Sequence, residues 1–273
     1  MPLSSMDGLT AAIIGVPTVW GKDPVTAKAA GIPHTPWYGT GIVGAGAAPT
    51  GGLNGANFTG PAVAGQIGMP AAVAGATSVI LRANATQAGN VGGMWLVDRQ
   101  WGNVPVVTTT GAQAITQPTL PARDASASTS GVGVVLALEC SAATGNGAPI
   151  TNTTVSYTNS AGVAGRTATL TSFPATAPQG TFVVFSLQAG DVGVRSVQSI
   201  TLGTSYVSGQ IHLIAFRLVC ELPPGPVTAV TNYLSFTQLG RPTVWDASVL
   251  QLVYIPTGTA VGATYGSLSY AQG

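Results

Sequence analysis

Charged residues are scarce in this sequence. Asp, Glu, Lys and Arg make up only 6% of its 273 residues, against about 25% in an ordinary soluble protein. Nine basic and eight acidic residues leave a net charge of +1, and the basic residues are scattered along the chain. Nucleic-acid binding depends on clustered cations that neutralise phosphates, so the sequence argues against it. The sequence also lacks a cationic amphipathic face that would bind a membrane surface.

A long apolar run and a secretory leader are lacking as well. The longest uncharged apolar candidate, Pro61–Leu81, is interrupted by Pro70 and several glycines, whereas a membrane-spanning helix needs about 20 predominantly apolar residues. The first fifteen residues contain Asp7 and no basic region, unlike a signal peptide. We therefore expect no membrane span and no leader.

Strand-forming segments dominate the chain from Trp95 onward. Short runs rich in Val, Ile, Thr, Phe and Tyr alternate with clusters of Gly, Pro, Asn and Ser, a pattern typical of antiparallel sandwiches. This pattern predicts an all-β fold, with a jelly-roll-like β-sandwich at 91–256 and a C-terminal tail at 257–273. The expected strands are Val132–Glu139, Thr153–Tyr157, Arg166–Thr171, Thr181–Leu187, Val194–Leu202, Gln210–Cys220, Val227–Thr237 and Val244–Ile255.

Residues 1–90 have a different composition. Pro and Gly interrupt them often, and no residue from Ala29 to Leu81 is charged. Their Ala and Gly side chains offer too little area to offset the entropy of ordering the backbone. We therefore predict an extended, mostly irregular assembly arm that lies on a neighbouring molecule, and we expect deletion of 1–60 to leave a folded body. Large apolar residues would anchor this arm on its partner: Trp20, Trp37, Tyr38 and Phe58.

A glycine pattern within this arm matches a dinucleotide-binding fingerprint. Gly39, Gly41 and Gly44 satisfy G-x-G-x-x-G. That fingerprint must follow a hydrophobic strand, open a helix and have an acidic residue about 20 positions later. Here the next acidic residue is Asp98. The match follows from the abundance of glycine, and we expect no cofactor.

Residues that could carry catalysis are few. Of the two histidines, His34 lies in the Pro-rich arm and His212 lies in a strand-like run, so both are expected to be structural. Cys140 and Cys220 end two strand-like runs and are expected as buried thiols rather than a disulfide. No pattern of metal-ligand spacing occurs, so we expect no metal site and no catalytic residues.

Most acidic residues lie near an arginine in the sequence. We expect these scarce charges to form ion pairs that fix loops or subunit contacts. The expected pairs are Asp98 with Arg99, Arg123 with Asp124, Asp191 with Arg195, Glu221 with Arg217, and Asp246 with Arg241.

A carbohydrate site is the main alternative for two of these acids. Asp98 and Asp246 lie near Trp95, Trp101 and Trp245 in the sequence. Two facing carboxylates could hydrolyse a glycosidic bond, and the tryptophans could form a platform for sugar rings. A tryptophan that is half-buried at an interface is the more frequent situation.

Several segments together resemble a known class of protein. The segments are WLVDRQW (95–101), PARD (121–124), SYTNSAGVAGRTATL (156–170), GTFVVFSLQAGDVGVRSVQSITLG (180–203) and GQIHLIAFRLV (209–219). With the uncharged arm, they resemble virion structural proteins of tailed bacteriophages, particularly capsid decoration or cement proteins with a β-sandwich body. The resemblance covers about residues 90–255.

This resemblance implies a function in assembly. It implies a virion location after assembly in the host cytoplasm, contact with the major capsid protein and other capsid subunits, a homotrimer and no enzymatic activity. A host-recognition module at a tail or fibre tip is the alternative, and a secreted glycan-active enzyme is a third reading. Neither nucleic acid nor a membrane is an expected partner.

Overall fold

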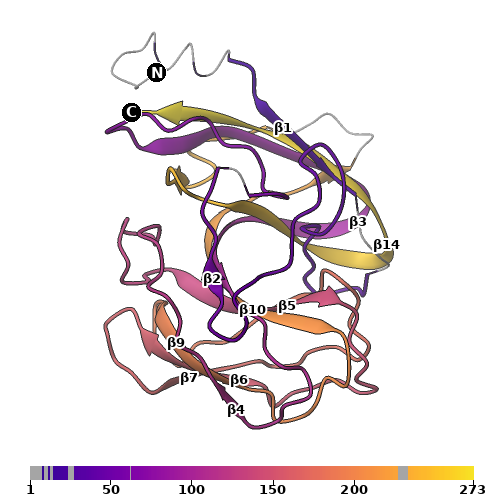
Figure 1. The fold of residues 1–273 in the computed structure, drawn as a ribbon. Coiled ribbons are helices and arrows are strands. Elements are labelled where there is room, and N and C mark those ends of the chain that lie inside the picture. Colours follow the sequence, from indigo (N-terminus) through magenta and orange to yellow (C-terminus); the bar gives the residue numbers. More distant parts are fainter. Residues whose placement is uncertain (1–7, 9–11, 13–14, 24–27, 62, 227–232) are drawn as a thin grey trace.

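The fold is all-β and sandwich-like (Figure 1). The computed structural model describes residues 8, 12, 15–23, 28–61, 63–226 and 233–273. Within these residues no helix is long and apolar enough to cross a membrane. The strands are β1 (Thr18–Lys22), β2 (Ala56–Asn57), β3 (Ser78–Gly102), β4 (Ala112–Ala114), β5 (Val134–Ala142), β6 (Thr154–Asn159), β7 (Arg166–Thr169), β8 (Phe182–Val184), β9 (Val194–Thr201), β10 (Gln210–Glu221), β11 (Gly225–Pro226), β12 (Leu234–Ser235), β13 (Thr243–Val244) and β14 (Leu250–Gln272).

The strands form two sheets. The larger sheet has the order β1-β14-β3-β10-β5-β8, with β2, β11, β12 and β13 also paired to β3, and the smaller sheet has the order β4-β9-β6-β7. Apart from the short β11–β3 pair, all ladders are antiparallel. The predicted antiparallel all-β class is therefore confirmed. Of the expected strand Val227–Thr237, residues 227–232 lie outside the described part of the chain.

Two long strands, β3 and β14, pair along nearly their whole lengths. Their far halves extend beyond β10, β5 and β8 (Figure 1) and pair there with β1, β11, β12 and β13. Residue 90 falls inside β3 and residue 256 inside β14, so both expected domain boundaries lie within a strand. The expected tail, 257–273, is mostly the second half of a strand. The first half of β3 was missed because Ala, Gly and Asn, which are depleted in strands, dominate it.

The larger sheet closes into a small barrel through a short segment that precedes β2. Residues 33–35 bridge β8 and β14, the two ends of the series β14-β3-β10-β5-β8. On one side, the Phe182 N–H donates to the Pro33 carbonyl over 2.9 Å, and the Thr35 N–H donates to the Gly180 carbonyl over 2.7 Å. On the other side, His34 and Tyr254 exchange two backbone hydrogen bonds of 2.8 Å. Closure leaves neither β8 nor the barrel half of β14 as an open edge.

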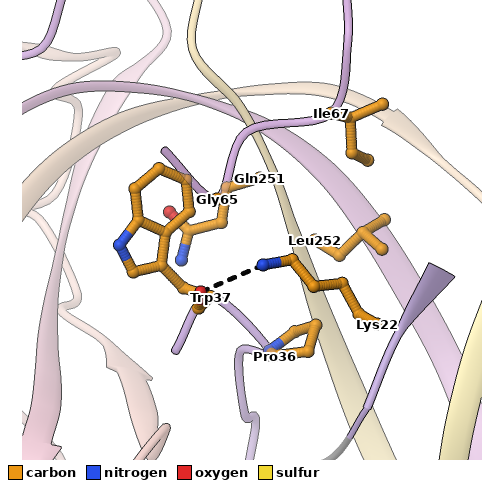
Figure 2. A pocket seen from close by; sticks show the side chains of 7 residues that line it. All are labelled: Lys22, Pro36, Trp37, Gly65, Ile67, Gln251 and Leu252. Atoms are coloured by element: carbon orange, nitrogen blue, oxygen red, sulfur yellow. Dashed lines mark hydrogen bonds between the residues drawn. The ribbon is translucent and has the colours of Figure 1, made fainter. Parts of the chain in front are cut away.

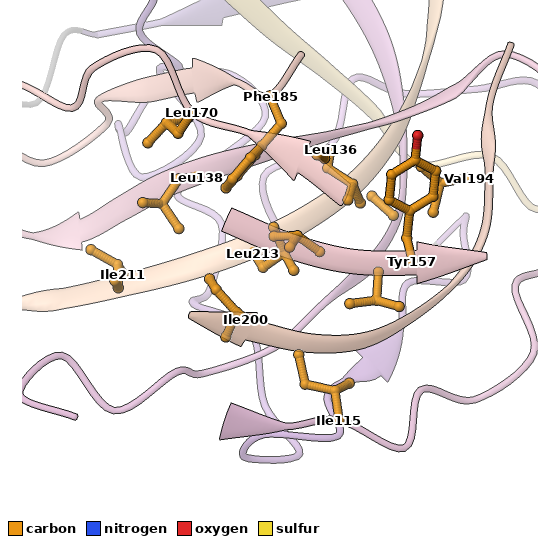
Figure 3. Packing of buried hydrophobic residues seen from close by; sticks show 14 of the residues in the cluster. Ile115, Leu136, Leu138, Tyr157, Leu170, Phe185, Val194, Ile200, Ile211 and Leu213 are labelled. Atoms are coloured by element: carbon orange, nitrogen blue, oxygen red, sulfur yellow. The ribbon is translucent and has the colours of Figure 1, made fainter. Parts of the chain in front are cut away.

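The main core fills the space between the barrel and the smaller sheet. Alternate residues of β5 and β10 point out of the barrel, among them Leu138 and Leu213, and meet Tyr157 and Ile200 of the smaller sheet (Figure 3). All four side chains are fully buried. This period-2 pattern explains why TFVVFSL and QIHLIAFRLV are apolar on both faces: one face lines the barrel and the other lines the core.

Candidate functional site

The N-terminal segment that was expected to leave the molecule lies on its own body. We call residues 15–69 the docked segment; residues 24–27 and 62 within it lie outside the described residues. β1 pairs with β14, residues 33–35 close the barrel, β2 pairs with β3, and Ile67 bridges to Leu250. The irregular backbone was predicted correctly. The expectation that its covering surface belongs to another molecule is wrong for the chain in this structure.

The four expected anchors contact this chain rather than a partner. Trp20 and Trp37 are each only 1% exposed, and Tyr38 and Phe58 are half-buried. These side chains were expected to bind a partner, and the surface that they contact in this structure is intramolecular. Trp37, Tyr38 and Phe58 converge on one ion pair inside the barrel.

That ion pair joins Arg99 of β3 to Glu139 of β5. Both side chains are completely buried, and the guanidinium donates two hydrogen bonds to the carboxylate, of 2.7 and 2.8 Å. Gln251 of β14 completes the cluster: its carbonyl accepts from Arg99 over 3.1 Å, and its amide donates to Glu139 over 3.1 Å and to Thr35 over 2.7 Å. Burial opposes ionisation of Glu139, but Arg99 outweighs it and lowers the pKa of the carboxyl.

Aromatic side chains of the docked segment cover the charged pair. The Arg99 guanidinium carbon lies 4.9 Å from the Trp37 ring centre and 4.5 Å from that of Phe58. The two rings meet edge to face. The Tyr38 hydroxyl donates a 2.9 Å hydrogen bond to Glu139. The segment therefore supplies the cation–π faces and a hydrogen-bond donor that stabilise charges otherwise costly to bury.

A second buried cation lies within the docked segment itself. The Lys22 ammonium donates to the carbonyl of Trp37 over 3.1 Å (Figure 2). It also donates to the carbonyls of Gly39 (3.0 Å) and Gly44. Burial lowers the pKa of Lys22 to about 8. The glycine-rich turn thus directs carbonyl oxygens at a lysine. A phosphate-binding loop would instead direct N–H groups outward. The space around this contact admits no water-sized group.

The burial of His34, in the barrel-closing segment, costs free energy. Its side chain has no exposed surface, and neither ring nitrogen has a partner with hydrogen-bond geometry among the described residues. Burial lowers its pKa to about 3; the nearby Lys28 ammonium lowers it further, and the Gly180 backbone opposes the shift. The adjacent Tyr254 ring, 6.3 Å away between ring centres, also has a buried hydroxyl with no partner. Each unpaired buried group weakens docking.

We expect the variant His34→Phe to be more stable than the native protein and less sensitive to acid. Below the ordinary histidine pKa of about 6.5, the unfolded chain binds a proton that buried His34 does not, so native stability falls until the pH approaches about 3. The loss attributable to His34 is on the order of 4 kcal/mol. Urea titrations from pH 7 to pH 3 would measure it. A variant curve parallel to the native one would contradict this account.

His212 provides the matched control for this substitution. Its pKa is also lowered, to about 4, mainly by burial, with Arg99 adding to the shift and Glu139 and the Asn103 backbone opposing it. Unlike His34, it is hydrogen-bonded at both ring nitrogens: Nε2 to the Ser141 hydroxyl at 2.6 Å and Nδ1 to the Asn103 carbonyl at 2.9 Å. We therefore expect His212→Phe to destabilise the fold at pH 7.

Asp98 lies at the centre of another buried polar cluster. Its carboxylate accepts hydrogen bonds from the Ser248 hydroxyl (2.6 Å) and the Val249 N–H (3.0 Å), and lies 3.8 Å from Arg123 and 3.9 Å from Arg217. Burial raises its pKa despite these partners. The side chain is fully buried and its oxygens are occupied, which removes the support for Asp98 and Asp246 as a hydrolytic pair.

The expected ion pairs are wrong in their partners. Asp98 and Arg99 are consecutive residues of one strand, so their side chains point to opposite faces and bind different groups. Asp191 pairs with Arg166 at 2.9 Å rather than with Arg195. Among the described residues, no salt bridge joins Arg123 with Asp124, Glu221 with Arg217, or Asp246 with Arg241.

Asp124 instead organises the loop that follows it. Its carboxylate accepts hydrogen bonds from the backbone N–H groups of Ser126, Ser128, Gly131 and Val132, and from the hydroxyls of Ser128 and Ser130. These bonds lower its pKa to about 2 against the opposing effect of burial. Asp124 is therefore a structural residue of this loop.

The remaining candidates for chemistry have structural environments. Cys140 and Cys220 are free and buried, as predicted, and burial raises each thiol pKa to about 12. The proposed sugar platform does not form around Trp101, which is fully buried and donates to the Asn54 carbonyl. In the described part of the chain no group of three His, Cys, Asp or Glu residues could bind a metal ion.

Two surface grooves lie elsewhere on the described residues. One, of about 200 Å³, is lined by the docked segment near Phe58. The other, of about 220 Å³, is lined by 92–95 of β3 and by Glu221, Leu222 and Pro223. Both are smaller than typical small-molecule pockets, which measure about 300–1,000 Å³.

Sequence reasoning missed the residues at the centre of the site, namely Glu139, Gln251 and Thr35. A usable signal existed for one of them, because Glu139 stands in the apolar run VVLALEC, and a charge in such a strand needs a buried partner.

Comparisons with family models, curated proteins and solved structures find no match to this chain.

Proposed function

We propose that this chain is a non-enzymatic structural protein of a bacteriophage virion that binds and stabilises the capsid. It would act as a homo-oligomer, with a trimer as the expected state, in contact with the major capsid protein. The observation that supports this proposal is the nearly uncharged outer surface. Of the charged side chains that the structure describes, only five are exposed: Asp23, Arg195, Glu221, Arg241 and Asp246.

A surface of 10,752 Å² with so few charges is unusual for a protein that works alone. The centres of protein–protein interfaces are depleted of charged residues in the same way. Isolated apolar side chains also reach this surface, among them Val192, Val207 and Tyr265, which are 47–67% exposed. Repeated contacts on a symmetric shell would let a modest gain per copy stabilise the whole particle by linkage.

Purified particles of the virus that encodes this chain would test the proposal. We expect mass spectrometry to find the protein in a fixed ratio to the major capsid protein, and electron microscopy with a labelled copy to place it on the capsid. Particles assembled without it should release their genome at a lower temperature. Particles that lack the protein when the virus is grown normally would refute the proposal.

Host recognition at a tail or fibre tip is a second candidate, and one observation favours it. The groove at β3 and β10 combines the partly exposed ring of Trp95 with the exposed carboxylate of Glu221, a pairing suited to a sugar ring and its hydroxyls. Binding on a glycan array that is lost in Trp95→Ala, together with a label at the tail, would favour this function over capsid binding.

A further inference from the structure

We infer that the docked segment is exchangeable, so that residues 15–69 of one copy of this chain occupy the same docking surface on a second copy. The surface is already defined by the contacts in this structure: the edge of β14 to which β1 pairs, the gap between β8 and β14 that residues 33–35 fill, and the Arg99–Glu139 pair. A second copy presents an identical surface. Exchange would therefore keep every contact and require no new complementarity.

The connection between the docked segment and the body permits this exchange. Residues 70–77 join the segment to β3, and none of them is buried. Fully extended, eight residues span about 26 Å. That is enough to lead the segment from one small domain to an adjacent one. Exchange would thus reorganise an exposed linker and leave the core between the barrel and the smaller sheet untouched.

The docked segment also carries buried polar groups that lack a hydrogen-bond partner among the described residues. They include the two ring nitrogens of His34 and the indole N–H of Trp20. These groups regain hydration when the segment leaves its surface, which reduces the free energy of undocking.

The low charge of the outer surface removes a barrier to the approach of two copies. A net charge of +1 gives little electrostatic repulsion between identical chains. On a protein with an ordinary surface, contact between two identical faces would desolvate many charged groups, and this costs free energy. The docked segment itself exposes apolar side chains, including Val19 and Ile42, which are 54% and 65% exposed.

Disulfide trapping between copies tests the inference. His34 lies opposite Thr181 in a pair flanked by the Pro33–Phe182 and Thr35–Gly180 hydrogen bonds. Directly opposed residues of this kind have Cα atoms about 4.5 Å apart, within the range that a disulfide accepts. One copy would carry His34→Cys and the other Thr181→Cys. The native thiols Cys140 and Cys220 are buried and unreactive.

We expect an equimolar mixture, refolded together and oxidised, to give a covalent dimer whose yield rises with protein concentration. Each variant refolded alone should give no covalent dimer, because it lacks the partner cysteine, and the same-chain double variant would establish that the pair closes. A second pair, Val19→Cys with Ser267→Cys, tests the β1–β14 contact independently. The inference is overturned if both same-chain doubles close while neither mixture gives a covalent dimer at any concentration. A virion location is tested separately, so either proposal can fail alone.

Discussion

A chain that begins at residue 70 is expected not to fold. The deletion removes the barrel-closing segment 33–35, strand β1, and the buried rings of Trp20 and Trp37. Loss of one buried tryptophan typically costs about 3–5 kcal/mol, and a whole domain is stable by only about 5–15 kcal/mol. Circular dichroism and amide-proton dispersion in NMR spectra would report the loss of native structure.

The same deletion also destabilises the buried ion pair and opens two strand edges. The Arg99–Glu139 pair loses its aromatic cover and the Tyr38 donor, and β8 and β14 become open edges that favour aggregation. Deletion of residues 1–7 alone is the control, because it removes none of the docked segment, and this variant should remain folded. A soluble, cooperatively folded chain starting at residue 70 would show that the docked segment is an accessory rather than part of the fold.

This expectation reverses the one drawn from the sequence, and the reason is physical. The composition of residues 1–90 shows correctly that they cannot cover themselves, because Ala and Gly offer little area to bury. Composition does not show where the covering surface is. That surface depends on the gap between β8 and β14, which lie about 70 residues apart in sequence, and no local pattern encodes the gap.

The body was more predictable because its signals are local. Strands β5, β6, β9 and β10 each begin within two residues of the expected position, since β-branched residues with period 2 and flanking turn residues define them. The first half of β3 has no such signal. Small residues such as Ala83 and Ala85 are fully or almost fully buried there, because they belong to a hydrophobic cluster that includes Trp20 and Leu268 from distant parts of the chain.

The charge pairs were only partly predictable from the sequence. Successive side chains of a strand point to opposite faces, which rules out a pair between Asp98 and Arg99. This rule could have been applied to the sequence alone. The true partners come from other strands: Glu139 for Arg99, and Arg123 and Arg217 for Asp98. Only the three-dimensional arrangement of the barrel brings them together.

Replacement of Glu139 by Ala is expected to destabilise the fold by about 3–5 kcal/mol, because it leaves the Arg99 charge buried and unpaired. The double variant Arg99→Met, Glu139→Gln removes both charges and keeps an acceptor for the Tyr38 hydroxyl, so we expect it to recover most of that loss. Chemical denaturation of the native protein, the single variants Arg99→Met and Glu139→Gln, and the double variant would give the coupling energy.

Glu221→Ala is the matched control, since Glu221 is an exposed acid that lies outside the ion pairs of the described residues. This substitution should change the free energy of unfolding by less than about 0.5 kcal/mol. The pH dependence gives a second readout. Because Arg99 lowers the pKa of Glu139, the pair stabilises the fold above the ordinary glutamate pKa of about 4.3 and loses this effect on acidification. If Glu139→Ala and Glu221→Ala proved equally mild, the ion pair would not be what holds the docked segment in the barrel.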